Sequence, residues 1–107
     1  MDRIDRHHAQ AVELLTYAFE RQHDPASNYR ARLLNNLAIL HILHGELEPC
    51  RRASEQLLRE ALDHNLLLMQ SWSYYLLGRV YQEWNQLELA AGYFKLVVDQ
   101  RFTSNLF

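Results

Sequence analysis

Hydrophobic residues recur along this chain at spacings of three and four residues, in five stretches separated by short polar breaks. In the first stretch Ile4, Val12 and Phe19 fall on one stripe, as in an amphipathic helix. The pattern predicts helices over residues 4–22, 29–44, 48–64, 67–84 and 87–101, followed by a short tail over 103–107. Pro25 and Gly45 stand where helices should end, because proline stops a helix and glycine supplies the left-handed residue after it.

The pattern also matches itself at an interval of about forty residues. Leu37-Ala38, Gly45, Leu47, Cys50, Leu57-Leu58 and Leu62 recur as Leu77-Gly78, Asn85, Leu87, Ala90, Val97-Val98 and Phe102. Each copy predicts a helical hairpin that cannot bury its apolar face alone. We therefore expect an all-α, right-handed superhelical stack of antiparallel hairpins. It would form a single domain over 1–107, with the second helix of a partial repeat over 1–24 and repeats over 28–64 and 66–102.

The second copy resembles the tetratricopeptide repeat. Tyr74, Leu77-Gly78, Tyr81, Ala90 and Phe94 have the spacing of that signature. The resemblance implies that small residues allow two helices to cross closely while aromatic residues fill the gaps around the crossing. In the first copy Leu37, Ala38 and Cys50 take the matching packing positions. There His41 stands for the second tyrosine and Ser54 for the phenylalanine, which favours a divergent subclass with longer hairpins.

Residues 72–94 and 31–62 are similar to the repeat region of MalT-type regulators, which are ATP-dependent bacterial transcription activators with a LuxR-type DNA-binding domain. The resemblance implies a sensor or protein-interaction region and not an enzyme. It transfers no ATP or DNA contact, because the chain has neither a phosphate-binding glycine loop nor a recognition-helix domain. The alternative is a free-standing tetratricopeptide-like adaptor that binds a peptide or a partner protein.

Composition narrows the function classes. The chain has 107 residues, 49% of them hydrophobic, with a net charge of −2 and no basic run, so we expect no direct contact with nucleic acid. Cys50 is the only cysteine, which fits a reduced, cytoplasmic setting and a small buried residue. No apolar stretch reaches membrane-spanning length, and the charged start does not resemble a signal peptide. Nothing in the sequence indicates a cofactor.

One face of the fourth predicted helix carries side chains that suit partner recognition. These are Trp72, Tyr75, Arg79 and Gln82, which the preceding repeat matches with Arg32, Asn35 and Ile39. In tetratricopeptide stacks this face lines the concave groove. Aromatic anchors, an amide and an arginine can bind a peptide there. The alternative is a groove that neighbouring repeats fill.

The last predicted helix carries a second apolar stripe, Leu89, Tyr93 and Leu96, roughly opposite its inward side. A helix at the free end of a stack should have a polar outer face. The stripe predicts that the chain continues past Phe107 or that this face meets another molecule, a second copy included. Ordinary exposed apolar residues are the remaining alternative.

The six histidines do not predict a metal site or a catalytic group. His41 and His44 share a helix face at a spacing of three, but the sequence alone places no third ligand beside them. We therefore expect His41 to be a packing or capping residue. No Ser-His-Asp, Cys-His or paired-carboxylate arrangement has a recognisable spacing.

Overall fold

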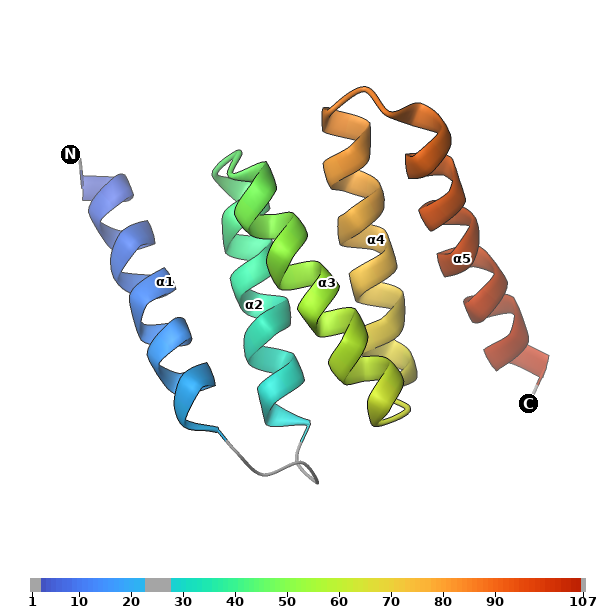
Figure 1. The fold of residues 1–107 in the computed structure, drawn as a ribbon, viewed down its shortest axis with the longest axis horizontal. Coiled ribbons are helices and arrows are strands. Elements are labelled where there is room, and N and C mark those ends of the chain that lie inside the picture. The colour runs from blue at the N-terminus through green and yellow to red at the C-terminus, as the bar shows by residue number, and fades with distance from the viewer. Residues whose placement is uncertain (1–2, 23–27, 107) are drawn as a thin grey trace.

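Five helices account for the part of the chain that the computed structural model describes, residues 3–22 and 28–106, with side chains to residue 100 (Figure 1). They are α1 (Arg3–Arg21), α2 (Tyr29–Leu43), α3 (Leu47–Asp63), α4 (Leu67–Glu83) and α5 (Leu87–Leu106). Those two ranges contain no strand. The predicted all-α class and the five helices are confirmed. The break predicted over His23 to Ser27 lies outside the described residues.

The helices follow one another in chain order as a row of antiparallel neighbours (Figure 1). Their Cα atoms occupy a slab of 47 × 37 × 18 Å, and its short dimension fits two layers of helices about 10 Å apart. Besides α1 and α3, α2 packs against α4, so the first helices of the two hairpins meet. Contact between equivalent helices of successive units is what makes a stack.

Three turns join the last four helices, and all three have the same geometry. Gly45, Asn65 and Asn85 each have a positive φ, of 71°, 54° and 59°. In each turn the amide of the following residue donates to a carbonyl five residues back at 2.8 Å, as in the Schellman motif. Glu46 and Leu66 occupy the N-cap positions of α3 and α4, and helices begin at Leu47, Leu67 and Leu87, at intervals of twenty residues. Glycine or asparagine tolerates the left-handed backbone that each turn requires.

Two groups of buried side chains form the core. Ala38, Cys50, Leu76 and Val80 join α2, α3 and α4 near the α2–α3 turn. Ala31, Leu34 and Leu57 form the second group, and Phe19 brings α1 against it. A fully buried leucine such as Leu57 contributes about 2 kcal/mol through lost contact with water.

The close crossing of α4 and α5 occurs at Gly78. A methyl group at that position would lie 2.5 Å from Cε1 of Phe94, so any larger side chain must displace the ring. The other predicted packing residues of the two hairpins are all buried or half-buried: Leu37, Ala38, Cys50, Tyr74, Leu77, Tyr81 and Ala90. The small residue at the crossing is therefore required by the approach of the two helices.

Helix α5 differs from its prediction in two ways. It continues to Leu106, where a non-helical tail is predicted, because no glycine or proline follows Gly92 to stop it. Its inward line also includes Tyr93, which is stacked on Tyr81 with ring centroids 5.7 Å apart. Tyr93 is therefore part of the packing between α4 and α5, and the outward stripe is reduced to Leu89 and Leu96, which are exposed.

Candidate functional site

The four groove residues predicted on α4 lie together along its accessible side. Trp72, Tyr75 and Gln82 are exposed, and Arg79 is half-buried. Trp72 and Tyr75 are each 37% exposed, so a partner can contact both rings while the rest of each residue stays packed. This set of four residues is called the α4 face below.

Contacts within the α4 face hold its side chains in place. Arg79 donates from Nη1 to the Tyr75 hydroxyl oxygen at 3.0 Å, and its guanidinium carbon lies 5.9 Å from the centre of that ring. Trp72 approaches Tyr75 edge-on at 6.1 Å, and Tyr75 also lies 6.2 Å from the Phe94 ring of α5. A surface already held in one arrangement loses less conformational entropy on binding.

The matching residues of the first hairpin do not extend this surface. Arg32 is exposed as predicted, but Asn35 is only 8% exposed, and Ile39 packs against the core group at Ala38. Asn35 is therefore too buried to line an open groove, while Ile39 is half-buried. Helix α2 is covered by α1, α3 and α4, which leaves few of its positions open to a partner.

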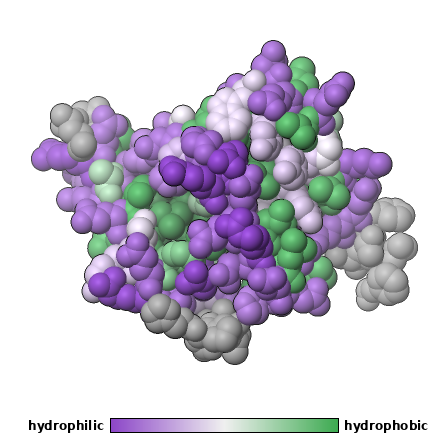
Figure 2. Space-filling model, in the orientation of Figure 1, coloured by the Kyte–Doolittle hydropathy of each residue, from purple (hydrophilic) through white to green (hydrophobic). Residues whose placement is uncertain are grey.

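Further apolar side chains are exposed around the stack. Leu67 and Leu68 begin α4, and Leu87, Leu89 and Leu96 lie on α5. Figure 2 shows one face of the molecule, on which hydrophilic side chains cover α3 and hydrophobic ones gather on both sides of it, over α2 and over α4 and α5. Grouped apolar surface is typical of interaction sites.

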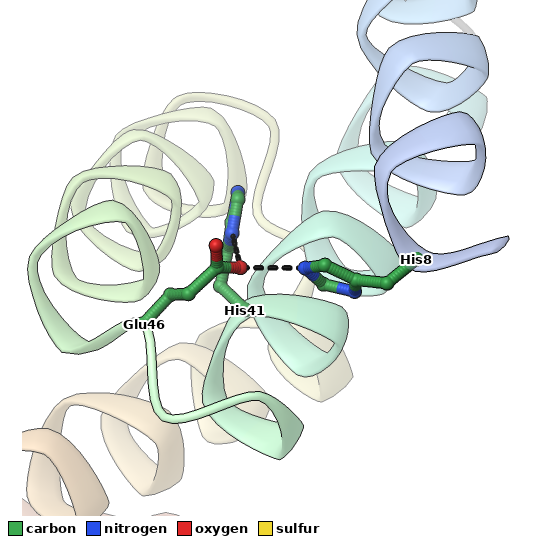
Figure 3. Close-up of side chains that lie close together, drawn as sticks. All are labelled: His8, His41 and Glu46. Carbon is green, nitrogen blue, oxygen red and sulfur yellow. Dashed lines mark hydrogen bonds and ion pairs between the residues drawn. The ribbon is translucent and has the colours of Figure 1, made fainter. Parts of the chain in front are cut away.

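Three side chains from separate elements meet at the α2–α3 turn (Figure 3). The Glu46 oxygen Oε1 lies 2.6 Å from Nε2 of His8 in α1 and 3.0 Å from Nδ1 of His41 in α2. Glu46 is the N-cap residue of α3, but its carboxylate makes no cap hydrogen bond and turns to the two imidazoles instead. This group is called the His8–His41–Glu46 cluster below.

The cluster keeps Glu46 ionised. Its pKa is lowered from the ordinary 4.5, first by the hydrogen bond from His41 and then by the one from His8, although desolvation opposes the shift. His44 stacks on His8 with ring centroids 3.5 Å apart and planes 17° apart. The His8 side chain is 10% exposed, and its Nδ1 has no hydrogen-bond partner among the described residues. Such a buried nitrogen requires an explanation.

The spacing of His41 and His44 places them on one helix face but indicates no partner for either. His8 and Glu46 are 38 residues apart, so nothing local links them. One signal was present, because the spacing of His8 from Ile4 and Val12 places it on the inward stripe of the first helix. The spacing of residues along the sequence does not indicate where α1 docks along α2.

Cys50 is buried as predicted. Its Sγ lies 3.8 Å from Oγ of Ser54, the neighbour one turn later in α3. Burial raises the pKa of the Cys50 thiol, and a protonated, enclosed thiol is a poor nucleophile. The thiol therefore gives no support to a catalytic role.

Comparison with known proteins adds no identity. No family model, curated protein or solved structure matches the chain. Of the helices described, none combines the length and the apolar character needed to cross a membrane.

Proposed function

We propose that this chain is a non-enzymatic helical-repeat domain that binds a segment of a partner protein through the α4 face. The single observation behind the proposal is the pre-arranged set of Trp72, Tyr75 and Arg79, half-open to solvent and held by mutual contacts. Tryptophan, tyrosine and arginine are the residues that most often dominate binding energy at protein interfaces.

The chemistry of the α4 face favours a peptide that carries an apolar or aromatic side chain and a nearby carboxylate. The two rings offer flat apolar surface at small cost in side-chain entropy. The Arg79 guanidinium can pair with a carboxylate while retaining its contact with Tyr75, and Gln82 can bond a peptide amide.

The biological setting we propose is the sensor region of a MalT-like, ATP-dependent transcription regulator in the cytoplasm. In that setting the stack binds an inducer, a partner or the regulator's own nucleotide module, and it shifts the equilibrium between off and on states through unequal affinity for the two. The alternative is a free-standing adaptor. A reading frame that also encodes a nucleotide-binding module and a helix-turn-helix domain supports the regulator, and a frame lacking both overturns it.

Selection from a displayed library of random peptides tests the binding role. We expect enriched peptides to bind the wild-type chain and to lose at least about tenfold in affinity to Tyr75→Ala and to Arg79→Ala. The control is Arg59→Ala, an equally simple truncation of an exposed arginine on α3, which should change affinity less than about twofold. Melting curves of all variants should stay close to wild type. Failure to enrich any peptide, or full binding by both α4 variants, overturns the proposal.

We also propose that the outward side of α5 contributes to self-association or to a contact with an adjoining domain. Leu89 and Leu96 are exposed seven residues apart, on one side of that helix. The test is sedimentation of the wild-type chain and of a Leu89→Glu, Leu96→Glu double variant. A wild-type dimer that becomes a monomer in the variant supports self-association. Equal masses for the two proteins count against it.

A further inference from the structure

We propose that the His8–His41–Glu46 cluster binds a divalent transition-metal ion of the zinc class and thereby fastens α1 to the α2–α3 turn. The three ligand atoms come from α1, from the end of α2 and from the residue that caps α3. All three lie within 4.8 Å of one another. Two imidazoles and one carboxylate are a ligand set that zinc uses when one coordination position stays open.

The three side chains must shift to accept the ion. Tetrahedral bonds of about 2.0–2.1 Å to zinc place neighbouring ligand atoms roughly 3.3 Å apart. The two nitrogen–oxygen distances, 2.6 and 3.0 Å, must therefore widen by about 0.7 and 0.3 Å, and the two imidazole nitrogens, which lie within 4.8 Å of each other, must come to the same spacing. Glu46 can adjust because its side chain is 41% exposed, whereas His8 and His41 are held at 10% and 15% exposure.

Charge and ligand type favour a transition metal over calcium or magnesium. One oxygen of the Glu46 carboxylate lies between the two imidazole nitrogens (Figure 3), so the three ligand atoms already face one another. Imidazole suits zinc, copper, nickel and iron, while calcium and magnesium require mostly oxygen ligands. His44 does not join as a fourth ligand, because its ring is nearly parallel to His8 and the two sets of lone pairs do not converge. Water can fill the remaining position on the exposed side of Glu46.

Metal binding would mainly stabilise the docking of α1. This helix contains no fully buried residue, and its packing is mainly against α2. At its far end it is held by Arg30 of α2, whose guanidinium covers the Phe19 ring at 3.9 Å and donates to the Gln22 carbonyl at 3.1 Å. A metal bond at His8 would secure the other end. Binding to the docked form alone stabilises that form by mass action.

Titration of the metal-free chain with Zn²⁺ and Co²⁺ tests the proposal, with Mg²⁺ as the unsuitable ion. We expect one equivalent to bind, a visible Co²⁺ absorption of low-symmetry coordination, and a Tm increase of roughly 10 °C at zinc concentrations about 100 times Kd. His8→Gln, His41→Gln and Glu46→Gln should each lower affinity more than about tenfold. His7→Gln and His64→Gln, which change exposed histidines outside the cluster, should bind as wild type.

Hydrogen exchange gives a second readout that does not depend on how well each variant folds. In the wild-type chain zinc should slow amide exchange in α1 more than in α4, and Mg²⁺ should have no such effect. The proposal is overturned if the wild-type chain binds zinc no more tightly than His8→Gln, or if bound zinc leaves exchange in α1 unchanged. The cluster would then be a pair of hydrogen bonds to one carboxylate and nothing more.

Discussion

The turns of the two hairpins have the same backbone geometry but carry different side chains. In both, a left-handed residue follows the first helix and a 2.8 Å hydrogen bond spans five residues. The α2–α3 turn carries His41, His44 and Glu46, whereas the equivalent positions of the α4–α5 turn are Tyr81, Trp84 and Gln86. A repeat backbone therefore does not dictate what its turn residues do.

The neighbouring helix accounts for the difference. At the α2–α3 turn, α1 brings the imidazole of His8, so a polar cluster can satisfy itself around one carboxylate. At the α4–α5 turn, Tyr81 packs between Tyr93, stacked at 5.7 Å, and the edge of Trp84, also at 5.7 Å, while Trp84 packs against the core group that includes Ala38 and Cys50. The α2–α3 turn is therefore completed by polar contacts with α1, and the α4–α5 turn by aromatic packing.

The largest effect should come from the helix crossing of the second hairpin. Gly78→Val should lower the free energy of unfolding by roughly 3 kcal/mol, because Phe94 blocks the new side chain and the core resists overpacking. In the first hairpin Ala38 and Ser54 occupy the positions of Gly78 and Phe94. There the methyl group of one helix faces a smaller side chain on the other. Urea unfolding measures the change.

A glycine elsewhere in the second hairpin provides the control for this prediction. Gly92→Ala should stabilise the chain by about 0.5–1 kcal/mol, because nothing lies within 4 Å of the new methyl group and alanine favours helix. A Gly78→Ala, Phe94→Leu double-mutant cycle should show positive coupling. Additive effects would contradict a direct clash between Gly78 and Phe94.

Exchanging the turn residues should have unequal costs. Tyr81→His should destabilise by about 2 kcal/mol, since it removes two aromatic contacts. His41→Tyr should cost less than about 1 kcal/mol in metal-free buffer, because its bond to the partly exposed Glu46 is worth little. Thermal or urea unfolding of both variants provides the comparison. Equal losses would mean that the two turns contribute alike.

The left-handed turn residue should show a smaller, purely backbone effect. Gly45→Ala should destabilise by about 1 kcal/mol, because its φ is 71° and no neighbour lies near the added methyl group. Gly45→Asn should cost less, since asparagine occupies the same position at Asn65 and Asn85. If alanine and asparagine cost the same in urea unfolding, the positive φ at Gly45 is not what selects the residue.

The smallest effect concerns pH. The folded pKa of Glu46 is lowered below its unfolded value of 4.5, mainly by His41, so its contribution is fully present above pH 4.5. That contribution should disappear as pH falls further, through the folded pKa. Unfolding curves in metal-free buffer from pH 6 to pH 3 should therefore converge for the wild type and Glu46→Gln. Curves that stay parallel would show that the Glu46 carboxylate is not stabilised in the fold.

Much of the fold followed from local pattern. The spacing of apolar residues predicts five helices, Gly45 and Asn85 predict the ends of two of them, and the small residue at Gly78 predicts a close crossing. The α4 face was also identifiable, because four residues on one side of a single helix stay on one side in any packing. Asn35 was placed wrongly since its burial depends on three other helices at once.

Sequence alone determined which segments form helices, where they turn and which small residues lie at the crossing, because backbone preferences and the 3.6-residue period act over a few neighbours. Tertiary structure decided the docking of α1. That docking brings His8 to a carboxylate 38 residues away. It also decided which side of α5 faces inward, so that Tyr93 joins the packing. Both depend on how whole helices fit together, and the free energy of that fit is shared among residues that no local pattern connects.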